Sequence, residues 1–204
     1  MATAEQMKQY EEVLKTHTPA LNKPVTEIVI FRTKEEITEE TRTALERDFV
    51  GPSSRGKGVR ATAWGYALDD PRTFVIAFDW EKIQYHWDFW QTPEFATVMG
   101  AIDKWFVPGR PLVRHYDFNP PGLLKSKFVS ISIWDEGEEK DVKEIKSKVN
   151  SEQQGWEARQ AGFAADMGEM TWCAVVLGYG SEEAARADGI QPKGVTHLVQ
   201  LKRA

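Results

Sequence analysis

Residues 60–80 read RATAWGYALDDPRTFVIAFDW. Two runs of strand-forming residues, 60–68 and 72–80, flank Asp69-Asp70-Pro71. β-branched and aromatic residues favour strands, whereas Asp and Pro favour turns. The stretch is therefore predicted to be a β-hairpin.

The elements on either side of this hairpin extend it to a βαββαβ unit. Upstream, 25–33 (VTEIVIFRT) is predicted to be a strand and 34–50 (KEEITEETRTALERDFV) a helix. Downstream, apolar residues recur at helical spacing over 81–106, where Pro93 kinks the helix or divides it in two. Residues 111–118 (PLVRHYDF) are predicted to be the closing strand.

The same order of elements recurs after the break at 119–122 (NPPG). The second series comprises a strand at 127–134, a helix at 140–161, strands at 163–168 and 170–180, a short helix at 181–190 and a strand at 195–202. A βαββαβ unit is the ferredoxin-like fold, a four-stranded antiparallel sheet with helices on one face. The predicted class is α+β, with two tandem ferredoxin-like repeats packing their bare faces as a dimeric-type α/β barrel. The expected boundaries are 1–22 for an N-terminal helical extension, 23–122 for the first repeat and 123–204 for the second.

Composition narrows the class of protein. The chain has 204 residues, of which 41% are hydrophobic, so it can bury a core and is not expected to be disordered. Its net charge of -5 argues against nucleic acid as a partner. A single cysteine, Cys173, cannot form an intrachain disulfide and is expected to be buried and inert. Without an apolar leader or a membrane-length apolar run, we expect a cytoplasmic monomer or homodimer.

Two local motifs add a family resemblance. Trp80-Glu81 ends a strand, and Thr92-Pro93-Glu94-Phe95 lies in the following helix. This combination resembles the antibiotic-biosynthesis-monooxygenase type of dimeric α/β barrel, and the tandem arrangement resembles fungal members that serve secondary metabolism. The resemblance covers about residues 25–118, and the second half matches only in element order. Members commonly carry a histidine three residues before the Ser/Thr, where this chain has Phe89, so the resemblance assigns no catalytic or haem role there.

Strand alternation predicts which side chains face a barrel cavity. We expect the Ala/Gly side of 60–68 to meet helices, which would leave the other side inside the barrel. The same reasoning places aromatic and hydroxyl side chains of 72–80 and 127–134 inside. The predicted substrate-binding residues are Arg60, Trp64, Phe74, Phe78, Phe128, Ser130, Ser132, Trp134 and Asp117.

Two histidines are the candidate acid/base groups. His115 and His197 each follow a valine by two residues in the last strand of their half, so we expect them at pseudo-equivalent positions. Histidine transfers protons near neutral pH, and Tyr66 would donate to an oxyanion. The alternative is that both histidines are packed strand residues. His86 is predicted to be structural or at a rim. The four histidines lack metal-binding spacing, so no metal is predicted. No cofactor is predicted either.

These features predict a cofactor-independent enzyme of secondary metabolism. Acid/base catalysis in an aromatic-lined pocket suits a cyclase, isomerase or dehydratase acting on a polyketide-like or terpenoid-like substrate. Cofactor-independent monooxygenation of an electron-rich aromatic is the first alternative, and a non-catalytic small-molecule-binding barrel is the second. A barrel packed solid is the third. The glycine-rich segment 51–58 is either a gate over the pocket or a surface insertion.

Overall fold

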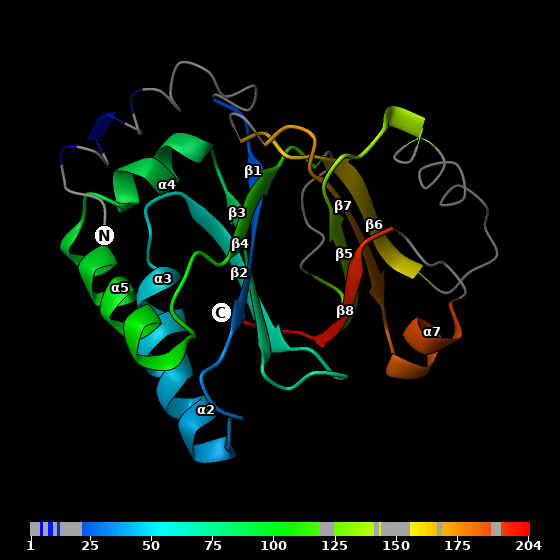
Figure 1. Ribbon diagram of the computed structural model, residues 1–204, viewed down its shortest axis with the longest axis horizontal. Coiled ribbons are helices and arrows are strands. Elements are labelled where there is room, and N and C mark those ends of the chain that lie inside the picture. The colour runs from blue at the N-terminus through cyan, green and yellow to red at the C-terminus, as the bar shows by residue number, and fades with distance from the viewer. Residues whose placement is uncertain are drawn as a thin grey trace.

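The computed structural model describes residues 22–118, 125–140, 143, 156–166, 169–188 and 193–204, together with the isolated positions 5, 8, 9 and 12. Most of the predicted N-terminal helix therefore lies outside the described residues. Two antiparallel sheets stand face to face (Figure 1). The strands are β1 Val25–Arg32, β2 Val59–Tyr66, β3 Thr73–Trp80, β4 Leu112–Tyr116, β5 Phe128–Trp134, β6 Trp156–Phe163, β7 Cys173–Tyr179, β8 Val195–Gln200 and β9 Lys202–Arg203.

Both sheets have the ferredoxin-like strand order. The first runs β4-β1-β3-β2-β9 and the second β6-β7-β5-β8. The predicted hairpin pairs β2 with β3, with Tyr66 opposite Phe74. Its turn is held by Asp70, whose carboxylate accepts hydrogen bonds from Thr73 Oγ1 at 2.9 Å and from the Arg72 backbone N–H at 3.3 Å. The α+β class and the tandem repeat are confirmed.

Helices cover the outer face of the first sheet (Figure 1). α2 Glu39–Leu45, the π-helical segment Glu46–Val50 and α3 Gly51–Ser53 follow one another, so the predicted loop at 51–58 begins as helix. α4 Ile83–Phe89 and α5 Pro93–Trp105 replace the single helix at 81–106. Pro93 occupies the first turn of α5, where a missing N–H costs nothing, and the Thr92 side chain accepts the Phe95 N–H.

The second half departs from prediction in one segment. β6 begins at Trp156, inside the predicted helix 140–161, and the predicted strand 163–168 contributes only Phe163 to it. Glu157, Arg159 and Gln160 are good helix formers, but pairing of this segment with β7 overrides that preference. Residues 141–142 and 144–155 of the predicted helix lie outside the described residues. α7 Glu182–Ala187 forms as predicted, capped by Ser181.

The bare faces of the two sheets pack together and close a barrel. Bridges join the sheets at both sides, Tyr116 to Ala164 and Ala67 to Val199. The chain then crosses over, so that β9 pairs with β2. At this crossing only glycine fits at position 65, because a Cβ there would overlap the Gln200 carbonyl oxygen. Among the described residues, no helix is long and apolar enough to cross a membrane.

The interior of this barrel corrects the predicted strand faces. It is filled by small and aliphatic side chains from both sheets, among them Ile28, Ala63, Val75, Ala77, Val129, Ile131, Val176 and Val199. Trp64, Phe74 and Phe78 pack instead under the helices of the first half. Phe128 and Trp134 pack on the α7 side of the second sheet. The Ala/Gly side allows close approach, as expected, but the element that approaches is the other sheet.

Candidate active site

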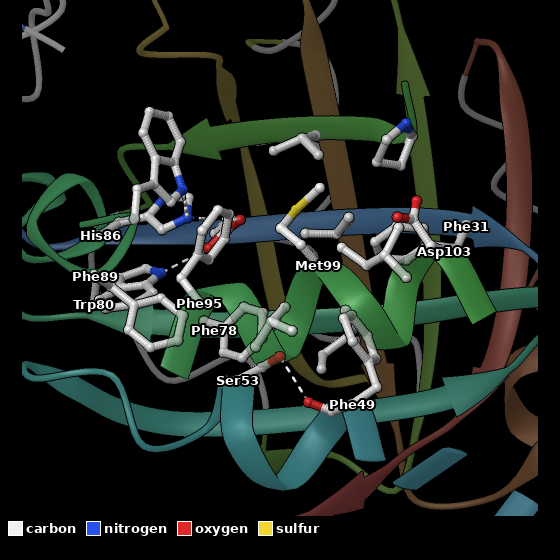
Figure 2. Close-up of a pocket in the computed structure, with 18 of the residues that line it drawn as sticks. Phe31, Phe49, Ser53, Phe78, Trp80, His86, Phe89, Phe95, Met99 and Asp103 are labelled. Carbon is white, nitrogen blue, oxygen red and sulfur yellow. Dashed lines mark hydrogen bonds and ion pairs between the residues drawn. The ribbon is translucent and has the colours of Figure 1, made fainter. Parts of the chain in front are cut away.

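A cavity of about 710 Å³ lies between the helix-covered face of the first sheet and helices α3, α4 and α5. This volume is within the range of small-molecule sites. Figure 2 shows aromatic rings and Met99 around it, including Phe31, Phe78, Phe89 and Phe95. Glu27 and His86 line one end. Apart from indoles, Ser53 and Asp103 are the other hydrogen-bonding side chains among the described residues at its wall.

Glu27 is a buried carboxylate on β1. Strand alternation puts it on the same face as Val25, Val29 and Phe31, so it points under the helices with only 4% of its surface exposed. Trp80 Nε1–H donates to Glu27 Oε2 at 2.8 Å, while Oε1 lies 3.6 Å from His86 Nε2. Burial raises the pKa of Glu27 because the charged form loses its hydration, although His115 and Trp80 oppose that shift.

His86 projects from α4 toward Glu27. Its ring stacks on Trp80, with 5.0 Å between centroids, and the ring of Trp90 lies edge-on to it. Trp90 Nε1–H donates to His86 Nε2 at 2.9 Å, and His86 Nδ1 lies 2.8 Å from His115 Nε2. Burial and the neighbouring His115 hold the pKa of His86 well below its usual value.

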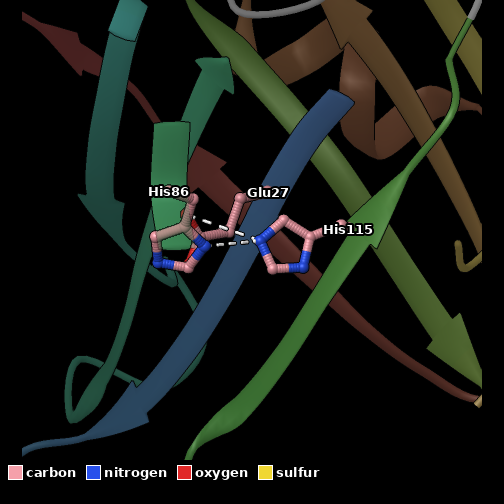
Figure 3. A group of neighbouring side chains, drawn as sticks. All are labelled: Glu27, His86 and His115. Atoms are coloured by element: carbon pink, nitrogen blue, oxygen red, sulfur yellow. Dashed lines mark hydrogen bonds and ion pairs between the residues drawn. The ribbon is translucent and has the colours of Figure 1, made fainter. Parts of the chain in front are cut away.

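His115 on β4 lies beside Glu27 and His86 (Figure 3). It connects this group to the second half of the chain through Asp166. Its Nδ1 lies 2.8 Å from Asp166 Oδ1, and its backbone N–H donates to Asp166 Oδ2 at 2.7 Å. Asp166 belongs to the connection between β6 and β7. Burial disfavours the charged ring, yet the carboxylates of Asp166, Glu27 and Glu169 together raise the pKa of His115.

The hydrogen bonds assign the tautomers of both rings. Because indole nitrogen only donates, His86 Nε2 must accept from Trp90, so neutral His86 carries its proton on Nδ1. That proton faces His115 Nε2, which must accept it. Neutral His115 then carries its own proton on Nδ1, facing Asp166. The four groups form one directed chain from Trp90 to Asp166.

The same residues have the spacing of a candidate metal centre. Ligand atoms of Glu27, His86 and His115 all lie within 4.8 Å of one another, and two histidines with a carboxylate suit a transition metal. However, each ring nitrogen already takes part in a hydrogen bond. A metal bound here would break the bond between His86 and His115, so the present geometry fits an acid/base group better.

Of the predicted catalytic residues, His115 lies in this group and the other two lie elsewhere. His197 shares the barrel-facing side of β8, opposite Ile131, so the two histidines are on non-equivalent faces and that prediction is wrong. Burial lowers the pKa of His197. Tyr66 packs in the helix-side core without lining the cavity, and no described residue hydrogen-bonds to its hydroxyl.

Of the predicted binding residues, Phe78 alone is among the described cavity-lining residues. Arg60 is exposed beside a β-bulge, and exposed Asp117 pairs with Lys23 at 3.4 Å. Ser130 and Ser132 lie on β5 in the second sheet, where Ser132 Oγ is 2.7 Å from Thr196 Oγ1. Trp64 and Phe74 are core residues beneath the helices, and Phe128 and Trp134 are core residues of the second sheet.

Sequence reasoning missed Glu27 and Asp166 and gave His86 a minor role. A signal existed for Glu27, which is a lone acid within the apolar strand VTEIVIFRT. His86 lies one helical turn before Phe89, the position where the resemblance leads one to look for a histidine. Asp166 had no such signal, because its contact with His115 depends on how the two halves pack.

Comparisons with known proteins identify the fold. No protein-family model matches the chain, and no curated protein matches its sequence significantly. An anthrone oxidase-like protein of known structure is 11% identical, with 91% of this chain and 95% of that chain covered at a TM-score of 0.62. A provisionally named monooxygenase from Fusobacterium nucleatum is 11% identical, with coverages of 88% and 92% and a TM-score of 0.58. Another from Lactobacillus acidophilus is 14% identical, with coverages of 89% and 94% and a TM-score of 0.56. At these identities the likeness shows the dimeric α/β-barrel fold.

Proposed function

We propose that this protein is an enzyme that removes a proton from a flat, apolar substrate held against Glu27. The observation that carries the proposal is a buried carboxylate at one end of a cavity walled mainly by aromatic and aliphatic side chains. Glu27 has one oxygen fixed by Trp80 and a second that is free of a close hydrogen bond from any described residue. A desolvated carboxylate is a stronger base than one in water, which suits an acidic C–H or phenolic O–H.

The lining also limits the substrate. None of the described residues that line the cavity is Lys or Arg, while Glu27 and Asp103 contribute acidic groups. A carboxylate, phosphate or thioester-linked nucleotide would therefore meet no counter-charge and would pay the full cost of desolvation. The expected substrate is an uncharged polycyclic ketone or phenol of the polyketide type.

The anion formed by Glu27 has two possible fates. Reprotonation elsewhere on the substrate is the reaction of an isomerase, and deprotonation is also the first step of a cyclase or dehydratase reaction. Addition of dioxygen to the carbanion gives a hydroperoxide after protonation. Loss of water then leaves one oxygen atom in the oxidised product, which is the reaction of a cofactor-independent monooxygenase. Similar structures named as monooxygenases and as an anthrone oxidase-like protein favour the second fate, whereas our sequence-based preference for cyclisation or isomerisation has no further support.

Anthrone, a tricyclic ketone with an acidic methylene, is a suitable probe. In anaerobic deuterated buffer, the wild-type protein should exchange the methylene protons faster than buffer alone, as followed by NMR of anthrone. Glu27→Gln keeps the size of the side chain and the Trp80 contact but removes the base, so the protein-dependent rate should fall about 100-fold or more.

His197→Ala is the matched control, because His197 lies on the barrel-facing side of β8 and does not line the cavity. This variant should exchange the anthrone protons at the wild-type rate. Equal rates for wild type and Glu27→Gln would contradict the proposal. Repeating the reaction in air with an oxygen electrode then separates the two fates, since only oxygenation consumes dioxygen.

A further inference from the structure

We infer that His86, His115 and Asp166 form a proton relay behind Glu27, and that the second half of the chain supplies the carboxylate on which this relay ends. The inference rests on the proposed function, because it says where the proton removed from the substrate goes. It assigns to Asp166 the role of a positioning residue.

The first support is that the four residues form a continuous series of close contacts. Glu27 Oε1 lies 3.6 Å from His86 Nε2, His86 Nδ1 lies 2.8 Å from His115 Nε2, and His115 Nδ1 lies 2.8 Å from Asp166 Oδ1. All three bases in this path are at least nine-tenths buried, with His86 6% and His115 3% exposed. A path of close contacts therefore leads from the cavity wall to Asp166 in the second half of the chain. Figure 3 shows its first three residues, Glu27, His86 and His115.

The proton can move along this path with every proton and every charge accounted for. The substrate loses a proton to Glu27 Oε1 and keeps the electron pair as an enolate or phenolate. Glu27 passes the proton to His86 Nε2, which gives up its hydrogen bond from Trp90, and His86 releases its Nδ1 proton to His115 Nε2. The product is an imidazolium on His115, paired with the Asp166 carboxylate, beside a neutral His86 and a regenerated Glu27 carboxylate.

The surroundings give this transfer a direction. Among the described residues, the charged and titratable groups around His115 are Glu27 from β1, His86 from α4, Arg114 from its own strand, and Asp166 and Glu169 from the β6–β7 connection. The carboxylates favour a proton on His115, whereas burial and His115 itself disfavour one on His86. A proton that reaches His86 is therefore more stable one step further on.

Hydrogen bonds to the His115 backbone hold Asp166 beside the His115 ring. Its Oδ2 accepts the His115 backbone N–H at 2.7 Å, and the Ala165 N–H donates to the His115 carbonyl at 2.7 Å. These contacts lie next to the bridge between Tyr116 and Ala164 that closes the barrel. The packing of the two halves thus fixes the tautomer of a histidine that belongs to the first half.

The test is nitrogen-15 NMR of protein labelled on histidine, without substrate. In the wild type, neutral His86 and His115 should both be protonated on Nδ1, and His115 should titrate above the usual histidine pKa. In Asp166→Asn that pKa should fall and the tautomer of His115 should become mixed. Asp117→Asn removes an exposed carboxylate close in sequence and should leave His115 unchanged.

Activity provides the second readout. Asp166→Asn should slow anthrone exchange at least about tenfold, and the acid limb of its pH–rate profile should move to lower pH along with the His115 pKa. A wild-type spectrum with His86 protonated on Nε2 would overturn the relay, even if the variant failed to fold. So would stoichiometric binding of Zn²⁺ to both rings at neutral pH. Failure of anthrone exchange with the predicted tautomers intact would count against the proposed function and leave the relay standing.

Discussion

At the scale of single residues, the site places an acid where the fold would be more stable with an apolar side chain. Glu27 sits among Val25, Val29 and Phe31 on the buried face of β1, and its pKa is raised mainly by desolvation. The folded state therefore binds a proton at Glu27 more tightly than the unfolded state does. Stability from this group is fully present below the unfolded pKa and is lost as pH rises through the folded pKa.

Glu27→Gln should accordingly stabilise the protein at neutral pH. We expect the free energy of unfolding to rise by about 1 kcal/mol or more at pH 7, because a neutral amide replaces a buried charge and still accepts the Trp80 hydrogen bond. Urea titrations at several pH values measure this difference, which should shrink as the pH falls toward the usual pKa of glutamate. A variant less stable than wild type at pH 7 would show that the carboxylate is well compensated.

At the residue level, the sequence singles out His115 from its own strand but not the residues that packing brings into contact with it. His115 could be chosen because Val-x-His occurs in the last strand of both halves, at Val113/His115 and Val195/His197. The carboxylate that contacts His115 could not be predicted. Asp117 is close to His115 in sequence but is exposed, whereas Asp166 is distant in sequence and contacts the ring. His86 was underestimated because helical spacing does not show which neighbouring element faces it.

At the scale of elements, the corner between α4 and α5 holds both polar and aromatic parts of the cavity. α4 ends at Phe89, and α5 begins at Pro93. Between them the Thr92 hydroxyl donates to the Phe89 carbonyl at 2.7 Å and accepts from the Phe95 N–H at 3.3 Å. This corner sets His86 and Trp90 on one side and Phe95 on the other. From the sequence, Pro93 predicts either a kink or a division of the helix, and the structure shows a division. Cap and proline act locally, which is why a break could be expected at this position.

Thr92→Ala should lower the free energy of unfolding by about 1 kcal/mol, the usual cost of losing a helix N-cap. Thermal unfolding followed by circular dichroism measures this effect. Thr92→Ser retains the hydroxyl and is the matched control, with stability close to wild type. Identical melting of wild type and Thr92→Ala would mean that the cap does not hold the corner.

Element faces were harder to predict than the elements themselves. The pattern of Ala61, Ala63, Gly65 and Ala67 marks a close approach but does not say whether a helix or a sheet approaches. In this fold the small residues meet the second sheet, and the rings on the other side build the cavity wall and the core under the helices. Likewise, local preference placed residues 156–161 in a helix, and only pairing with β7 makes them a strand.

At the scale of the whole molecule, the two halves have different tasks. The element order predicted two ferredoxin-like units and a closed barrel, and the structure confirms both. Among the described residues, the barrel interior is packed mainly with small and aliphatic side chains, and the cavity lies under the helices of the first half, not between the sheets where the sequence placed it. The second half closes the barrel and contributes Asp166 to the polar end.

We expect the substrate to bind under helices α4 and α5 and not between the sheets. Methionine methyl NMR tests it directly, because Met99 lines the cavity while Met170 lies at the surface with half of its area exposed. On addition of anthrone, ring currents should shift the Met99 methyl signal, assigned with Met99→Leu, and leave the Met170 signal in place. Binding of anthrone that leaves Met99 unshifted would contradict the account.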